Sequence, residues 1–417
     1  MATVTLPETR AQAIEIDRAD PLAAFRERVV LPAGVIYLDG NSLGPPPHRT
    51  LERIQQLMAT EWGGDLIRSW TSRGWIDLPE RVSAALAPLI GAAPDEVMIA
   101  DSVSVNLFKL LAAALRLRSR RRVILSEREN FPTDLYMAQG LVDLLGDRAL
   151  LRVVPRLELL AALDEDVAVL MLTQVDFRTG EIHDVAAWTD AAQAVGALAL
   201  WDLSHSAGAI PVDVTGCGAD LAVGCGYKYL NGGPGAPSFA FVARRHHADV
   251  RVPLWGWMGH AEPFEFSPDY APAPGVASLR VGTPPILSLA ALECGIATIV
   301  EIWIDPLRAK SVELAEMFIG LMEGGHAPSG FELVSPRHPG KRGSHVSFRH
   351  PEGYAIMQAL IERGVIGDFR APDLLRFGFA PAYLRFVDVW DAAQILGDVM
   401  RTSAWDRPEH RRRAKVT

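Results

Sequence analysis

Between residues 97 and 242 the chain alternates short runs of β-branched and aliphatic residues with longer amphipathic stretches. Apolar runs bounded by turn residues and separated by helix-length segments predict parallel strands joined by crossover helices. Helical stretches at 106–117 and 185–195 separate some of these runs, so we expect a mainly parallel sheet covered by helices on both faces. The expected strands are 97–100, 122–125, 167–172, 197–201, 221–223 and 239–242.

The pattern changes after this region. Residues 284–303 read as a long apolar helix and 306–322 as an amphipathic one. Beyond Pro336, short apolar runs at 345–348 and 374–379 predict strands, and 354–362 and 387–400 predict helices. We therefore expect an N-terminal arm and first helix in 1–60, a large α/β domain in 61–290, and a small α+β domain in 291–417 on which the N-terminal segment packs.

Composition narrows the function. The net charge of −9 over 417 residues argues against a nucleic-acid partner or an anionic membrane surface, which usually require a basic patch. No apolar run reaches transmembrane length, and the N-terminus lacks the pattern of a signal peptide. Cys217, Cys225 and Cys294 form no CxxC pair, so neither a disulfide framework nor a metal site is expected. A cytoplasmic protein is the expectation.

Residues with chemical potential follow several of the expected strands. In open α/β sheets, ligands bind beyond the carboxyl ends of the strands, so these residues are candidates for one site. In chain order they are Ser102 and Ser104, Phe131 and Asp134, Thr173, Asp202 and His205, and Tyr227 and Lys228.

Lys228 is the central candidate. Only five of the 41 basic residues are lysines, and Lys228 is the one charged residue between 221 and 243. Desolvation favours the neutral amine that a Schiff base requires, and Arg cannot replace Lys there. The alternative is a lysine whose stem covers apolar surface while its ammonium group stays in water. Lys109, alone in an apolar helix, fits that alternative.

The neighbouring candidates each admit two interpretations. Asp202 could pair with a protonated pyridine nitrogen, which makes a cofactor ring an electron sink, or it could cap the following turn. His205 could contact a cofactor or be a structural histidine. Ser104 could help bind a phosphate at a helix N-terminus or belong to an ordinary helix cap. Phe131 could cover a ring face or be a core residue.

Several motifs resemble the kynureninase family. They are Leu38-Asp39-Gly40-Asn41-Ser42, Phe131-Pro132-Thr133-Asp134, Trp201-Asp202-Leu203-Ser204-His205, Tyr227-Lys228-Tyr229-Leu230-Asn231, Gly256-Trp257-Met258-Gly259-His260 and Gly343-Ser344-His345-Val346-Ser347. The resemblance runs in order from about Ile36 to Leu396. It implies fold type I of the pyridoxal-phosphate enzymes, related to the class V aminotransferases, and a homodimer with shared active sites.

The resemblance also implies an activity: hydrolysis of L-kynurenine to anthranilate and L-alanine in tryptophan catabolism and NAD biosynthesis. Lys228 would hold pyridoxal phosphate and move the α-proton, Asp202 would pair with the ring nitrogen, and Tyr227 would carry protons during carbon–carbon cleavage. Asp134, Phe131, Thr173 and His205 would surround the ring.

The resemblance also implies contacts to the cofactor phosphate, the substrate α-carboxylate and the substrate's aromatic ring. Val103, Ser104 and Tyr227 would bind the phosphate, together with Trp257 and Thr283 from a partner subunit. Arg376 would bind the substrate α-carboxylate, and Ser42, Trp70 and Gly282 would lie near its aromatic end. Thr283 and Trp70 resemble the bacterial subgroup that prefers kynurenine over 3-hydroxykynurenine.

Two other fold type I activities are the alternatives. An aminotransferase would convert the cofactor to its amine form with an α-keto acid. A cysteine desulfurase requires a nucleophilic cysteine on a mobile late loop, and the last cysteine here, Cys294, falls inside an expected helix.

Overall fold

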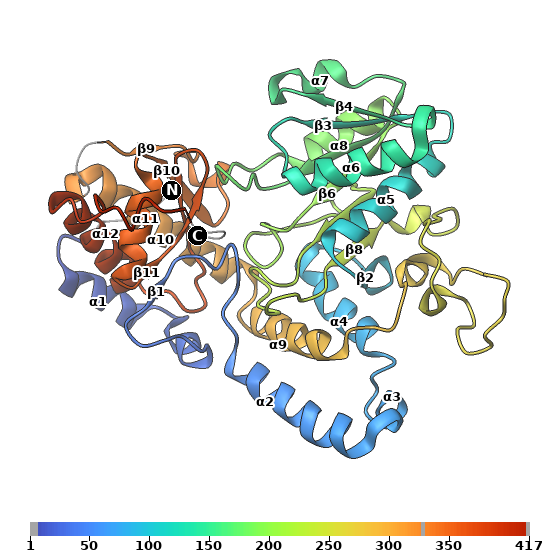
Figure 1. Cartoon of the computed structure of the whole chain (residues 1–417), viewed down its shortest axis with the longest axis horizontal. Helices are drawn as coiled ribbons and strands as arrows, with labels where there is room; N and C mark the ends of the chain where they lie inside the picture. Colours follow the sequence, from blue (N-terminus) through green and yellow to red (C-terminus); the bar gives the residue numbers. More distant parts are fainter. Residues whose placement is uncertain (1–6, 327–329, 414–417) are drawn as a thin grey trace. The chain divides into compact units, whose positions relative to one another are not determined.

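The computed structural model describes residues 7–326 and 330–413. The chain forms two compact units (Figure 1). The small unit comprises the chain up to Arg49, Phe177–Ile182, and the chain from Glu301 onward; the large unit comprises Thr50–Asp176 and His183–Val300. Relative to the expected domain limits, the boundaries lie at 49/50 and 300/301, and the short segment Phe177–Ile182 joins the small unit although it interrupts the large one in sequence.

The large unit is built on a seven-stranded sheet with the order β2-β8-β7-β6-β5-β3-β4. In the described chain β8 is antiparallel to both of its neighbours, and the other pairs are parallel. The carboxyl ends of the other six strands therefore lie at one edge. The strands are β2 (Val97–Ile99), β3 (Val123–Glu127), β4 (Leu150–Val154), β5 (Val167–Thr173), β6 (Leu198–Asp202), β7 (Leu221–Gly224) and β8 (Phe239–Val242).

Helices cover both faces of this sheet. α5 (Val103–Leu117) and α6 (Pro132–Leu145) pack side by side (Figure 1) and share a core with alternate strand residues such as Met171 and Leu200. Because successive strand residues point to opposite faces, Trp201 points away from that core, and its indole Nε1 donates to Thr189 of α8 over 3.0 Å. The other α-helices here are α2 (His48–Gln56), α3 (Ser69–Ser72), α4 (Leu78–Leu86), α7 (Leu159–Ala162), α8 (Val185–Ala194) and α9 (Ile286–Ile302).

The small unit contains an antiparallel sheet with the order β12-β13-β10-β9 and a short parallel pair, β1 with β11. Phe318 packs against Phe377 with ring centroids 4.9 Å apart, at the centre of an apolar core that also includes Leu396. Its elements are α1 (Arg10–Ala19), β1 (Ile36–Tyr37), α10 (Ile304–Leu321), β9 (Glu332–Leu333), β10 (His345–Arg349), α11 (Gly353–Glu362), β11 (Val365–Ile366), β12 (Asp368–Arg370), β13 (Leu374–Gly378) and α12 (Phe386–Arg401).

The prediction that Lys109 keeps its head in water is wrong. Its side chain is fully buried, and Nζ donates to Asp101 over 2.7 Å and to the carbonyl oxygen of Leu279 over 2.6 Å. Asp101 adopts a φ of 50°, outside the usual range for L residues, directly before α5. Burial therefore lowers the pKa of Lys109, partly offset by the Asp101 charge, and the lysine is a structural ion-pair partner.

The described helices also bear on membrane association. None of them alone is long and apolar enough to cross a membrane; α9 and α10 reach such a length only when counted together across the break at Trp303.

Candidate active site

The loop after β7 presents Lys228 at the carboxyl edge of the large sheet. Lys228 Nζ lies 3.0 Å from His205 Nε2, 6.0 Å from the ring centroid of Phe131 and 5.9 Å from that of Tyr227. The loop packs tightly: a Cβ at Gly226 would lie only 2.4 Å from the carbonyl oxygen of Pro237. Glycine at this position thus allows the approach that presents the half-buried amine.

Two carboxyl groups, one at the end of β6 and one at the start of α6, are buried near this amine. Asp202 ends β6 and Asp134 lies in the first turn of α6; their exposed fractions are 3% and 0%. Asp202 Oδ1 accepts the backbone N–H of Ser204 over 2.7 Å, so this carboxylate does cap the following turn. That role leaves its second oxygen for another partner, and the two interpretations of Asp202 are therefore compatible.

Electrostatics couple the two carboxyl groups. Burial, reinforced by the charge of Asp202, raises the pKa of Asp134 well above its ordinary value, and burial also raises the pKa of Asp202. When both are ionised, Asp134 Oδ1 has no hydrogen-bond donor among the described residues. A proton held between the two groups gives them a shared hydrogen bond. The pair is thus short of positive charge.

Two further residues beside the carboxyl pair are Thr173, which ends β5, and Phe131, which precedes α6. Thr173 Oγ1 lies 3.4 Å from Asp134 Oδ2. Phe131 leaves its ring 38% exposed, an uncommon state for phenylalanine. The structure therefore brings together seven of the residues expected from the sequence: Phe131, Asp134, Thr173, Asp202, His205, Tyr227 and Lys228.

Asn130 is a residue that the sequence reasoning missed. Its side-chain oxygen accepts from the Thr173 hydroxyl over 2.5 Å and from the backbone N–H of Phe131 over 2.7 Å. The signal available in the sequence was its position directly before the Phe131-Pro132-Thr133-Asp134 motif.

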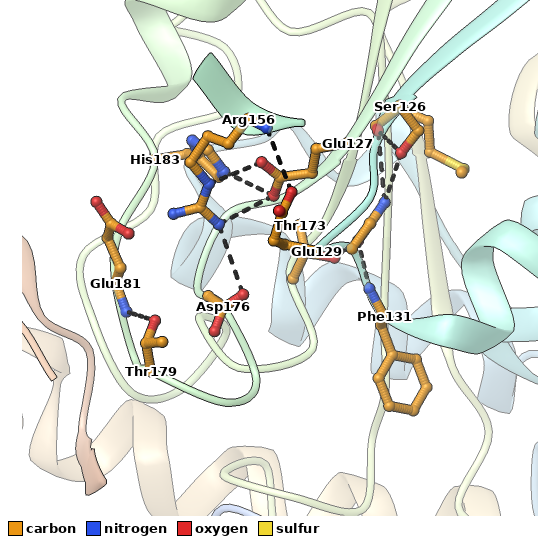
Figure 2. A network of polar contacts seen from close by, with 12 residues as sticks. Ser126, Glu127, Glu129, Phe131, Arg156, Thr173, Asp176, Thr179, Glu181 and His183 are labelled. Atoms are coloured by element: carbon orange, nitrogen blue, oxygen red, sulfur yellow. Dashed lines mark hydrogen bonds and ion pairs between the residues drawn. The ribbon is translucent and has the colours of Figure 1, made fainter. Parts of the chain in front are cut away.

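A separate ionic cluster lies at the end of β3 (Figure 2). Glu127 is 1% exposed and accepts from Arg156 Nε over 2.8 Å; its Oε1 lies 2.9 Å from His183 Nε2. Arg156 also lies 3.5 Å from Asp176. Although burial acts to raise it, the pKa of Glu127 is lowered because His183 and Arg156 together outweigh burial.

The start of α5 is suited to an anion. Ser102 is the N-cap, and its side chain accepts the backbone N–H of Val105 over 3.4 Å. Val103 and Ser104 form the first helical turn after β2, where backbone N–H groups and the helix dipole favour negative charge. Since β2 is parallel to β7, this turn follows the same sheet edge as Lys228.

Tyr227 lies beside Lys228 as a neutral phenol. Burial, reinforced by the neighbouring Cys225 and Asp202, raises its pKa above the ordinary value. The hydroxyl therefore keeps its proton at neutral pH and can donate a hydrogen bond, although the raised pKa makes it a weaker acid than a free phenol.

Four expected residues have their contacts elsewhere in the large unit. Trp70 packs edge-on against Trp75 with centroids 6.0 Å apart, and Trp257 lies 5.7 Å from the ring centroid of Phe264. Gly282 and Thr283 are exposed. The roles expected of Trp257 and Thr283 involve a second subunit, and all four assignments stay predictions.

In the small unit, Arg376 and Ser42 belong to one buried cluster. Arg376 donates to Asp368 through Nε at 2.8 Å and Nη2 at 2.5 Å, and Nη2 lies 3.0 Å from Ser42 Oγ. Through these two hydrogen bonds Asp368 holds the Arg376 guanidinium in one orientation, and the substrate contact expected of Arg376 stays a prediction. The charge of Asp368 also acts on Asp39, whose pKa burial and that charge together raise to about 7.

The residues present fit pyridoxal phosphate. Among the described residues, Asp134 and Asp202 have no cationic side chain in contact, and a protonated ring nitrogen would supply that charge. Lys228 offers the amine, Phe131 offers a partly exposed ring, and the first turn of α5 favours an anion. Within the described ranges, no group of three or more His, Cys, Asp or Glu side chains is placed to hold a metal ion.

Solved structures with the same architecture define the class. A cysteine desulfurase from Thermococcus onnurineus has a TM-score of 0.77 at 19% identity, over 96% of this chain and 100% of that one. A cysteine desulfurase from Escherichia coli has a TM-score of 0.76 at 20% identity, over 92% of this chain and 98% of that one. The fold is that of the fold type I pyridoxal-phosphate enzymes.

Sequence relatives define the family within that class. A kynureninase from Burkholderia mallei is 53% identical over 98% of this chain and 100% of its own length. A kynureninase from Pseudomonas fluorescens is 51% identical over the same shares. A family model described as the kynureninase C-terminal domain matches residues 307–396. The chain belongs to the kynureninase family, as its motifs indicated, and is a pyridoxal-phosphate-dependent hydrolase of carbon–carbon bonds.

Proposed function

We propose that this chain hydrolyses L-kynurenine to anthranilate and L-alanine, a step of tryptophan catabolism. The observation that carries the proposal is the full-length similarity to kynureninases from two bacterial genera. The geometry of the large unit supports its cofactor half, because a buried carboxyl pair short of positive charge lies beside a half-buried lysine.

The reaction adds water across one carbon–carbon bond. The Cβ–Cγ bond breaks, the water oxygen joins Cγ to form the carboxylate of anthranilate, and Cβ gains a proton to become the methyl group of alanine. When bound, pyridoxal phosphate accepts the electron pairs released at Cα and Cβ.

The chain's own residues then move protons and orient the substrate. The Lys228 amine is the base for the α-proton, and its 3.0 Å contact with His205 holds it at the pocket. The Tyr227 phenol, which is protonated at neutral pH, donates a hydrogen bond to the reacting group and carries a proton during the carbon–carbon cleavage. Arg376 binds the α-carboxylate, for which a rigid guanidinium held by Asp368 is suited.

The finer assignments rest on the family resemblance. The protein acts in the cytoplasm as a homodimer, with Trp257 and Thr283 reaching the phosphate of the partner subunit. Val103, Ser104 and Tyr227 bind the phosphate from the same chain, while Ser42, Trp70 and Gly282 border the aromatic end of the substrate. Thr283 and Trp70 favour kynurenine over its 3-hydroxylated form.

The test is direct. Purified protein loaded with pyridoxal phosphate is incubated with L-kynurenine, and anthranilate is followed by its fluorescence, with Lys228→Ala as the control. We expect anthranilate from the wild type and none from the variant. No anthranilate from the loaded wild type would contradict the substrate assignment, and undiminished product from Lys228→Ala would contradict the site as well.

A further inference from the structure

Asn130 occupies a position that none of the roles above explains. It lies between β3 and α6, its exposed fraction is 4%, and both ends of its amide are engaged. We propose that Asn130 is a positioning residue for the cofactor, fixing the Phe131 peptide and the direction in which the Thr173 hydroxyl donates its proton. This inference rests on the proposed function in that it assumes a cofactor ring between Phe131 and Asp202.

The nitrogen end of the amide is fixed by acceptors. Nδ2 donates to Ser126 Oγ over 3.0 Å and to the carbonyl oxygen of Met171 over 3.4 Å. The Ser126 hydroxyl gives its own proton to that carbonyl oxygen over 2.7 Å. Because its proton is committed, Ser126 Oγ can only accept from Asn130, as can the Met171 carbonyl oxygen. Either acceptor alone keeps the amide from turning over, so Oδ1 must face the opposite way.

The oxygen end then determines two neighbours. Oδ1 accepts the backbone N–H of Phe131 over 2.7 Å, which fixes the peptide that carries the exposed ring. It also lies 2.5 Å from Thr173 Oγ1. An amide oxygen can only accept, so the single hydroxyl proton of Thr173 points at Asn130.

The direction of that proton matters for the carboxyl pair. Thr173 has one hydroxyl proton for two acceptors, Asn130 Oδ1 at 2.5 Å and Asp134 Oδ2 at 3.4 Å, and the nearer acceptor takes it. Asp134 then loses a hydrogen bond that would lower its pKa and faces a lone pair of Thr173 Oγ1 instead. A lone pair facing a carboxyl group favours the protonated form of that group. Asp134 then stays neutral, in agreement with the raised pKa that burial gives it, and Asp202 remains the single negative partner for the ring nitrogen.

The experiment measures cofactor affinity without substrate. Apoprotein prepared from the full chain is titrated with pyridoxal phosphate, and Kd is read from the visible absorbance. We expect Asn130→Ala and Thr173→Val each to raise Kd about tenfold. The double variant should also raise it about tenfold rather than a hundredfold, because both changes remove one shared contact. Effects that multiply to about a hundredfold would overturn the proposal.

Ser126→Ala is the matched control. It removes a buried hydrogen bond from the same chain but leaves Oδ1 with both of its donors and Nδ2 with Met171. Its Kd should change less than about threefold, even though its thermal unfolding midpoint falls as much as that of Asn130→Ala. A tenfold rise in Kd for Ser126→Ala would reduce Asn130 to a structural role.

A second variant guards against misfolding of Thr173→Val. Thr173→Ser keeps the hydroxyl that donates to Asn130 Oδ1 and adds no charge. Its Kd should stay within about threefold of the wild type, since the donor is retained; a tenfold rise would overturn the proposal. Because no step uses kynurenine, these outcomes are independent of whether anthranilate forms.

Discussion

The large unit buries two groups of carboxylates at the same sheet edge, and they differ in whether cationic side chains neutralise them. Glu127 is paired with Arg156 and His183, and the two partners lower its pKa despite burial. In the part of the chain that the structure describes, Asp134 and Asp202 have no cationic side chain in contact, and burial raises the pKa of both. The first group is a finished ionic cluster, while the second is completed only by a ligand.

The difference separates structural acids from functional ones. A buried carboxylate is expensive unless it is paired, so a chain that keeps two unpaired ones needs a compensating partner. Buried acids with raised pKa values beside a cleft are candidates for function, whereas saturated clusters belong to the fold. Exposed fraction alone would not have distinguished Glu127 from Asp202.

The largest effect should come from Asp202→Asn. The amide keeps the turn but cannot pair with a protonated ring nitrogen, so we expect kcat to fall on the order of 10²–10³-fold, as when one partner of a buried charge pair is removed. Thermal unfolding of the apoprotein should be unchanged or shifted upward. A variant with near-normal kcat would break the comparison.

Glu127→Gln should act in the opposite sense. Removing the main partner leaves Arg156 with the longer 3.5 Å contact to Asp176, so the loss should be about 3 kcal/mol of unfolding free energy, the lower end expected for breaking a buried pair. Turnover per folded, loaded molecule should stay within about threefold, because the cluster does not surround Lys228. Urea unfolding of the apoprotein and active-site titration measure the two quantities.

The unfolding free energy of the apoprotein should fall with rising pH because of Asp134 and fall with decreasing pH because of Glu127. Asp134 binds its proton more tightly when folded, so its contribution is present below its ordinary pKa of 3.8 and is lost as pH rises through the raised value. Glu127 contributes above 4.5 and loses that contribution as pH falls through its lowered value. Each tenfold change in proton affinity corresponds to about 1.4 kcal/mol.

Isosteric variants assign the two limbs. Unfolding free energy measured by urea at several pH values should lose its decline with rising pH above 3.8 in Asp134→Asn and part of its decline with falling pH in Glu127→Gln. If Asp134→Asn leaves the decline with rising pH intact, the raised pKa does not belong to this pair.

The smallest effect should come from His183→Gln. Glu127 keeps Arg156, and the glutamine amide can replace one donor, so the loss should be about 1 kcal/mol of unfolding free energy. Urea unfolding measures it. A loss as large as that of Glu127→Gln would mean that His183, and not Arg156, neutralises the glutamate.

Much of the site could be predicted because strand order and strand ends are local features. The runs that became β3, β5, β6 and β7 are apolar, and the candidate residues lie at or shortly after their ends, so the shared edge followed from parallel pairing. α6 and β4 were missed since their positions are less regularly apolar, with Leu144 and Leu150 exposed.

Partner choice could not be predicted. A lysine in an apolar helix, such as Lys109, can either extend its ammonium group into water or be buried in an ion pair. Burial occurs here because the fold places Asp101 within 2.7 Å of its Nζ. In the same way, the bidentate contact of Arg376 with Asp368 depends on the pairing of β12 with β13. Nor does the sequence indicate that Phe177–Ile182 leaves the large unit, because no composition change marks it.

The burial of Lys109 has a practical consequence for covalent labelling. Lys109 and Lys310 are both buried in ion pairs, whereas Lys228 is half-buried and Lys341 is exposed. Amine-directed reagents should therefore find few reactive side chains on a protein of 417 residues. Replacing Lys341 and Lys415 with arginine would leave Lys228 as the principal lysine open to acylation, and bound cofactor should shield it.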